Sequence, residues 1–323
     1  MIWATWRMHR SIFLASIAIA MAFAVWLAIT GGMEEHSWTI FTSHHCSLNY
    51  PGSSAVCMSS LSGTGNFSSV NAALCGALPA LLGLVLGVPL VAGEIQQRTN
   101  RLAWTQSITR TRWLLTKIGV GALFTAAIVG ALAPLFWWWT DAAQRNSHIQ
   151  PPNFDISGFV GVAYALSAFM LGVALGALIR RAGWAFAACV PIFALVRIGI
   201  RLYVRPGLIS PTTVTVGADA PVGNTDWYLN AGFVPIGRST PAPGQTWANS
   251  NLVIEKCQGL GYGTQKAAHS ATYCERANHL HYVMQFQPPG HFWPLQGAES
   301  AIFLVLAGAL LALTVLAVRR WRT

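Results

Sequence analysis

Residues 157–179, SGFVGVAYALSAFMLGVALGALI, form a run of 23 residues without a charged side chain. A helix rises about 1.5 Å per residue, so a run of this length crosses a hydrocarbon layer about 30 Å thick. A buried helix of a soluble protein would carry a polar face, which this stretch lacks. The stretch therefore predicts a transmembrane helix.

Five further apolar runs of 20 to 22 residues occur, at 11–30, 72–92, 118–139, 183–203 and 297–318. The first three of these also lack charged side chains. The whole chain agrees, since 54% of its 323 residues are apolar and 9% are charged, whereas soluble domains are about 25% charged. The mean hydropathy is +0.47. We expect an all-α integral membrane protein with six transmembrane helices.

Lysine and arginine placement predicts the orientation, because basic loops stay in the cytoplasm. The segments 1–10, 93–117, 180–182 and 319–323 hold 12 Lys or Arg residues and one acid, Glu94, whereas the opposite set holds six basic residues and eight acids. Both termini are therefore expected in the cytoplasm, in a bacterial plasma membrane. The first run reads as an uncleaved anchor, since it exceeds the usual length of a signal-peptide core. The net charge of +10 reflects this topology and gives no sign of a nucleic-acid partner.

The segment 204–296 is the longest between two spans and is rich in Pro, Gly, Asn and Thr. Such spacing of prolines breaks long helices, so we expect short helices and loops in this extracytoplasmic region. It divides the chain into 1–203, with spans one to five, the region 204–296, and 297–323, with the sixth span and a cytoplasmic tail.

Four of the six cysteines fall in predicted outer segments, where disulfides persist. Two local bridges are predicted, Cys46 to Cys57 and Cys257 to Cys274, although four cysteines allow three pairings. The second bridge would staple the 204–296 region. No close ligand pair such as C-x-x-C occurs, so a zinc site is not favoured.

Charge inside the fifth and sixth runs marks a candidate site, because charge at membrane depth is expensive and often functional. Arg197, Arg201 and Arg205 recur every four residues along one helix face. Arg205 should lie outside the membrane, Arg201 can extend toward the interface, and Arg197 needs a partner. Glu299 is the expected partner of Arg197; a substrate-facing role for the arginines and contact with lipid headgroups are the alternatives.

Two small-residue motifs, Gly83-x-x-x-Gly87 and Gly172-x-x-x-Gly176, offer faces where helices approach closely. Glycine is also simply frequent in membrane spans, so the sequence leaves both interpretations open.

The segment 93–117 is the most informative in the chain. Apolar residues at helical spacing alternate there with arginines, which favours an interfacial helix that docks a partner or lies on anionic lipid. Glu94 is the single acid of this loop, and a local salt bridge from it would position the loop.

The pattern Glu94-x-x-x-x-Thr99, followed by Arg101-Leu-Ala-Trp-Thr-Gln-Ser-Ile-Thr-Arg110, Trp113 and Lys117, resembles the cytoplasmic loop of type-two ABC transporter permeases, particularly an actinobacterial group. The segments Thr5-Trp6-Arg7-Met8-His9-Arg10 and Phe292-Trp293-Pro294-Leu295-Gln296 look like the same group's first and last signatures.

The resemblance implies a permease subunit of an ABC exporter, in which residues 94–113 form a coupling helix seated in a separate ATPase. Glu94 and Thr99 would shape the turn, Arg101 and Arg110 would make polar contacts with the ATPase, and Trp104 would fill its groove. No G-x-x-x-x-G-K-[ST] phosphate loop occurs in the chain, so ATP and Mg²⁺ would be bound by the partner, and no catalytic or cofactor-binding residue is assigned here. Two permease subunits, as a homodimer or heterodimer, would flank the substrate path within membrane lipid.

The alternative is a stand-alone membrane sensor or binding protein. Its outer region would sense a ligand, and its basic loop would dock a cytosolic signalling partner. The identity of the partner separates the two hypotheses.

Overall fold

The computed structural model describes residues 2–44, 55–96, 109–143, 148–151, 153–215, 226–235, 237 and 279–320. The chain divides into two compact units. The first contains residues 1–146, 152–205 and 293–323, and the second contains 147–151 and 206–292.

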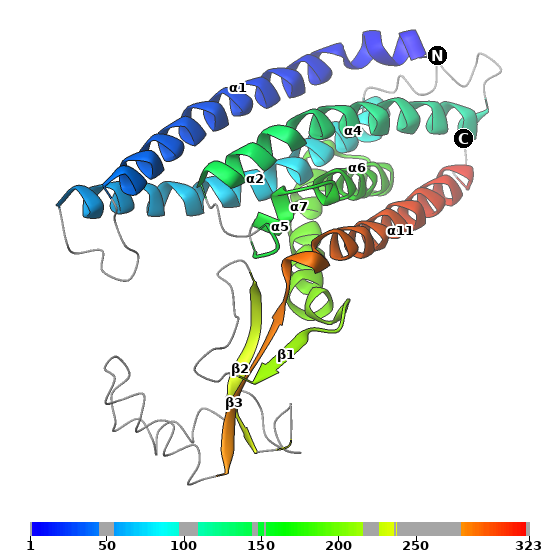
Figure 1. The fold of residues 1–323 in the computed structure, drawn as a ribbon. Coiled ribbons are helices and arrows are strands. Elements are labelled where there is room, and N and C mark those ends of the chain that lie inside the picture. The colour runs from blue at the N-terminus through cyan, green and yellow to red at the C-terminus, as the bar shows by residue number, and fades with distance from the viewer. Residues whose placement is uncertain are drawn as a thin grey trace. The chain divides into compact units, whose positions relative to one another are not determined.

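The first unit is helical (Figure 1). Its elements are α1 (Ile2–Ser43), α2 (Ala55–Gln96), α4 (Arg110–Ala143), α5 (Asn153–Ile156), α6 (Val160–Ile179), α7 (Ala182–Gly199), the π-helical turn η2 (Ile200–Val204) and α11 (Phe292–Arg319), which begins one residue before this unit. Among the described residues, six helices are long and apolar enough to cross a membrane, which agrees with the six predicted spans.

The helices α1, α2, α4 and α11 extend beyond the apolar runs that predicted them. The segment 31–71 was expected to link two spans outside the membrane, but α1 continues through it to Ser43 and α2 begins at Ala55. These helices continue into less apolar sequence because the residues there, such as Glu34, Glu35 and Met58, have adequate helix propensity. For these helices hydropathy alone therefore identified the apolar centre and missed one or both ends.

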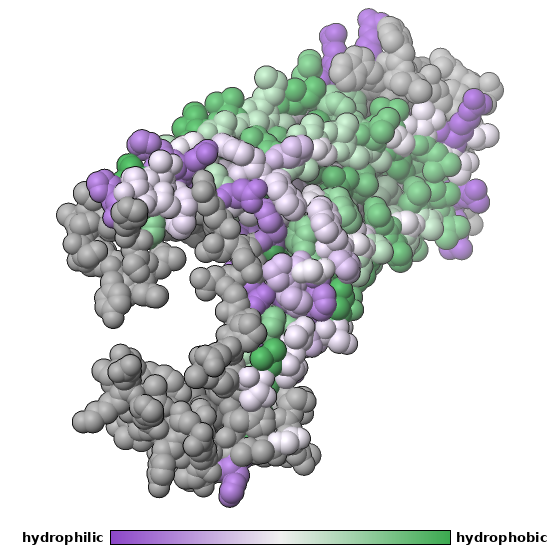
Figure 2. All heavy atoms as spheres, in the orientation of Figure 1, coloured by the Kyte–Doolittle hydropathy of each residue, from purple (hydrophilic) through white to green (hydrophobic). Residues whose placement is uncertain are grey.

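The helices α2 and α6 form the centre of this unit. About 72% of the most apolar window of each is buried, against 17–28% for the other four spans. Figure 2 shows apolar surface on the helical unit, with hydrophilic residues gathered toward its ends. The outer faces of α1, α4, α7 and α11 are thus suited to lipid.

The two glycine motifs face each other across α2 and α6. A Cβ added at Gly83 would lie 2.2 Å from the carbonyl oxygen of Ala165, and one at Gly87 would lie 2.2 Å from that of Phe169. On the opposite helix, a Cβ at Gly172 would lie 2.9 Å from the amide nitrogen of Val88. The close-approach interpretation of these motifs is therefore confirmed.

The second unit contains a three-stranded antiparallel sheet in the order β1-β3-β2, built from β1 (Thr212–Thr215), β2 (Trp227–Pro235) and β3 (Leu280–Gln287). It is followed by a short 3-10 turn, η5 (Pro289–His291). The expectation of an all-α chain with only short helices and loops in 204–296 is therefore wrong. Although prolines are frequent in this region, two short segments between them favour strands. Thr212-Thr-Val-Thr215 and Tyr282-Val-Met-Gln-Phe286 are rich in β-branched and aromatic residues.

The structure does not describe the side chains of the four cysteines in the predicted disulfides. Cys46, Cys257 and Cys274 are not among the described residues, and Cys57 lies in the part of α2 whose side chains are not described. The staple of the 204–296 region stays a prediction.

Candidate functional site

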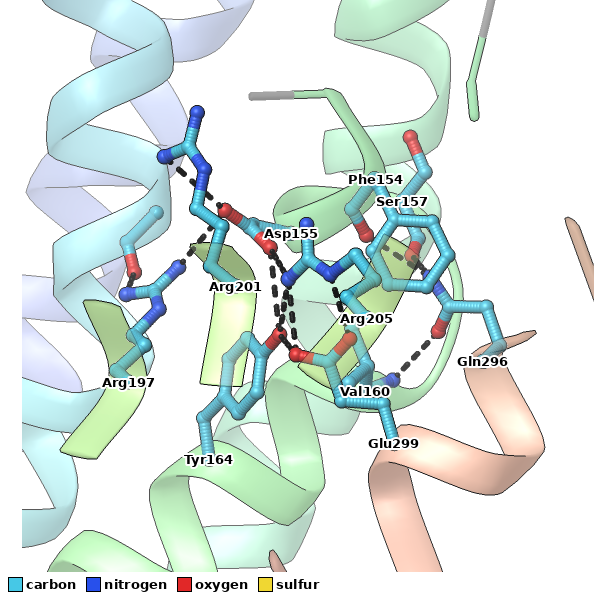
Figure 3. A network of polar contacts seen from close by, with 11 residues as sticks. Phe154, Asp155, Ser157, Val160, Tyr164, Arg197, Arg201, Arg205, Gln296 and Glu299 are labelled. Carbon is cyan, nitrogen blue, oxygen red and sulfur yellow. Dashed lines mark hydrogen bonds and ion pairs between the residues drawn. The ribbon is translucent and has the colours of Figure 1, made fainter. Parts of the chain in front are cut away.

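Arg205 lies at the centre of a buried charge cluster in the helical unit (Figure 3). Its Nε donates to Glu299 Oε2 at 2.6 Å, and its Nη2 donates to Glu299 Oε1 at 2.8 Å. The same Nη2 also bonds Asp155. Both side chains of the Arg205–Glu299 pair are fully buried. A bidentate guanidinium–carboxylate pair fixes geometry as well as charge.

Tyr164 joins the two carboxylates of the cluster. Its hydroxyl donates to Glu299 Oε1 at 2.6 Å and lies 3.2 Å from Asp155 Oδ1. Arg205 Nη2 donates to the same hydroxyl oxygen at 3.1 Å. The hydroxyl therefore bridges α6, α11 and the short helix α5.

Two further arginines approach the other oxygen of Asp155. Arg197 Nη2 lies 3.5 Å and Arg201 Nη1 lies 3.7 Å from Asp155 Oδ2. Arg197 also donates to the backbone carbonyl of Gly76 on α2, and its guanidinium lies 4.6 Å from the centre of the Tyr164 ring. Three guanidinium groups thus share two carboxylates, which leaves the cluster with one net positive charge.

The electrostatics of Asp155 follow from this arrangement. Burial by itself raises the pKa of this carboxyl group, but Arg205, Arg197 and Arg201 outweigh it and hold the pKa below its ordinary value of 3.8. The carboxylate therefore stays charged at neutral pH.

The end of the α7 segment explains why Arg205 is buried. The π-helical turn over 200–204 inserts an i to i+5 step, in which the Arg205 amide bonds the carbonyl of Ile200. Such a turn rotates the following side chain relative to a regular α-helix, and π-turns are frequent at functional sites. Pro206 follows and has no amide hydrogen with which to extend the helix.

Gln296 holds α5 in place one helical turn before Glu299. Its Nε2 donates to the carbonyls of Phe154 and Ser157 at 2.8 Å each, and its Oε1 accepts from the Val160 amide at 2.9 Å. Gly158, at a φ of +79°, makes the turn beside this side chain. The turn that carries Asp155 is therefore fixed by α11.

The structure corrects one sequence-based expectation. Glu299 pairs with Arg205 and not with Arg197, whose carboxylate partner is Asp155. Arg205 was expected outside the membrane; it is completely buried within the protein, and its depth relative to a membrane stays a prediction. A strict i, i+4, i+8 count could not foresee the π-turn that re-aims Arg205 toward α11.

Sequence reasoning also missed Asp155 and Tyr164. Asp155 was counted among the acids of an outer segment, although it stands between the apolar residues Phe154 and Ile156. Tyr164 is a lone polar ring within an uncharged run. Those two local contrasts were the available signals.

A second buried ion pair joins α2 to α4 on either side of the predicted coupling segment. Lys117 Nζ donates to Glu94 Oε1, and both side chains are about 95% buried. The ammonium also lies 4.7 Å from the centre of the Trp113 ring. The expected local salt bridge of Glu94 is therefore confirmed, and three residues of the loop resemblance meet at one point.

The other predicted coupling residues cannot be placed in this way. Thr99, Arg101 and Trp104 lie outside the described residues, and the side chain of Arg110 is not described although it begins α4. The described contacts thus join the end of α2, before the segment 97–108, to the beginning of α4, after it.

A multi-pass membrane protein with a buried charge cluster is the class that these observations define. A family model described as ABC-2 membrane transporter related matches residues 17–205, more than half of the chain. The chain therefore belongs to that family, whose members are ABC transporter permease subunits. No curated protein and no solved structure matches it significantly. The matched range includes Asp155, Tyr164 and Arg205 and ends before Glu299.

Proposed function

We propose that this chain is the permease subunit of an ABC exporter, driven by a separate cytosolic ATPase that binds the segment between α2 and α4. Family membership supports the permease role. The Glu94–Lys117 pair carries the coupling role, because it ties both ends of that segment into the helical unit.

The energetics favour a rigid connection. Removing one partner of a buried ion pair costs about 3–5 kcal/mol, since the other charge is left uncompensated. A force on the segment 97–108 would therefore reach α2 and α4 together. In this proposal Thr99 shapes the turn, Arg101 and Arg110 contact the ATPase, and Trp104 fills its groove.

The proposal includes a second permease subunit and a defined orientation. Both termini and the 93–117 segment would lie in the cytoplasm, and the unit with the sheet would lie outside. Reporter fusions after residues 96 and 237 test this orientation. A reporter active only in the cytoplasm should work at 96 and fail at 237, and the reverse pattern would contradict the proposal.

The experiment is a mild-detergent affinity purification of the tagged chain from its own host. We expect an ATPase with a phosphate-binding loop to be recovered with the wild type and lost with Trp104→Ala or Arg101→Gln. Arg319→Gln, an exposed basic residue at the end of α11, is the matched control and should retain the ATPase. Recovery of a kinase or regulator in its place would favour the sensor hypothesis.

A further inference from the structure

A cavity of about 340 Å³ lies between α2 and α7, beside the buried charge cluster. Its volume falls within the usual range for small-molecule sites. One wall comes from α2 and consists mostly of small residues, among them Ala73, Gly76 and Ala77. The other consists of apolar residues of α7, among them Val190 and Ile198. The narrow side chains of α2 leave the space that the cavity occupies.

The cavity reaches the lipid-suited surface of the unit. Leu81, Val190 and Ile198 line it and are 42%, 39% and 52% exposed. The opening therefore allows an apolar chain to enter the cavity from the hydrocarbon layer.

One end of the cavity is charged. Asp155, Arg197 and Arg201 line it there, and Figure 3 shows both guanidinium groups directed toward the Asp155 carboxylate. Asp155 already accepts from Arg205, so two arginines share its remaining oxygen at 3.5 and 3.7 Å. The net charge at this end is positive.

Arg201 has capacity for a further acceptor. Its side chain is 39% exposed, and within the described residues its only polar contact is the 3.7 Å ion pair. A guanidinium offers five N–H donors in a fork that matches phosphate and carboxylate groups. Arg197 differs, because its second nitrogen is engaged by the Gly76 carbonyl.

We propose that this cavity binds an amphiphile with an anionic head group and one apolar tail, the head at Arg201 and Arg197 and the tail along α2 and α7. The positive charge selects the head, and the alanine-lined wall receives the tail. Binding of this class of molecule does not depend on the proposed function. Its transport by the permease does rest on the proposed function.

Native mass spectrometry of the purified chain in a neutral detergent tests the site. Dodecyl phosphate is the probe, dodecylphosphocholine has the same tail with a zwitterionic head, and inorganic phosphate is the head alone. We expect dodecyl phosphate to bind at least about tenfold more tightly than dodecylphosphocholine, the size of effect that a hydrogen bond to a charged group produces. It should also bind at least about tenfold more tightly than inorganic phosphate, which lacks the apolar tail.

Two variants address the two ends of the cavity. Arg201→Gln should weaken dodecyl phosphate about tenfold and weaken dodecylphosphocholine less, because the choline ammonium already offsets the phosphate charge of the second probe. Ala77→Leu should weaken both tailed probes by filling the apolar part. Arg181→Gln, at the opposite end of α7, is the matched control and should bind as the wild type does.

Equal binding of the two tailed probes, or unchanged binding by Arg201→Gln, would overturn the proposal. The measurement uses the permease without an ATPase, so a negative result counts against the site alone. Failure to recover an ATPase in the purification counts against the proposed function alone.

Discussion

Arg205 and Glu299 form a bidentate ion pair with no exposed side-chain surface, although 94 residues separate them in the chain. The pair joins the end of the α7 segment to α11. Asp155 and Tyr164 complete it from α5 and α6. One cluster therefore fixes four helical elements of the membrane unit.

Glu299→Gln should lower the free energy of unfolding by about 3–5 kcal/mol, because Arg205 would lose its bidentate partner in a buried place. The double variant Arg205→Leu with Glu299→Leu should lose less stability than the sum of the losses of the single variants Arg205→Leu and Glu299→Leu. Thermal unfolding in detergent measures both. Additive losses would show that the two side chains do not interact.

Glu94→Gln and Lys117→Gln should likewise be non-additive, with an interaction free energy of about 1–3 kcal/mol, since each residue is the other's partner. The same unfolding assay provides the double-mutant cycle. An interaction free energy near zero would contradict the role of this pair as the anchor of the 97–108 segment.

Gly87→Ala should destabilise the chain by about 1–3 kcal/mol, because its new Cβ would overlap the Phe169 carbonyl oxygen. Gly119→Ala on α4 is the control, since nothing lies within 4 Å of the added atom. The control should be neutral or slightly stabilising, because alanine favours a helix. Equal effects at the two positions would argue against the α2–α6 contact.

Acid should weaken the charge cluster through Asp155. The pKa of this group is lowered in the folded chain, so its stabilising contribution is fully present above the ordinary value of 3.8 and is lost as the pH falls through the lower folded value. Unfolding temperatures measured from pH 7 to pH 3 should therefore fall more for the wild type than for Asp155→Asn. Glu35→Gln, an exposed acid on α1, should follow the wild type. Parallel curves for wild type and Asp155→Asn would contradict the assignment.

The six spans were predictable because each depends on a local property, an apolar run of sufficient length. A salt bridge of Glu94 was predictable for a similar reason, since it is the single acid in a loop with five basic residues. Which of these basic residues is its partner was not predictable. The glycine motifs of α2 and α6 were visible, but their pairing required knowledge of which helices touch.

The charge cluster could not be derived from spacing. The π-turn over 200–204 changes the direction of Arg205, and a regular helical count assigns that residue to the wrong surroundings. Asp155 receives its role from three arginines and from the Gln296 contacts that hold its turn, all of them distant in sequence. The sheet was missed because prolines were weighted above the short β-branched segments.

The coupling of this chain to a separate ATPase is tested by measuring ATP hydrolysis in the complex that co-purifies with it. We predict that the recovered complex hydrolyses ATP, that Trp104→Ala abolishes both recovery of the ATPase and hydrolysis, and that Arg319→Gln leaves both unchanged. A chain that purifies without an ATPase, or an ATPase that stays bound and equally active with Trp104→Ala, would contradict the account.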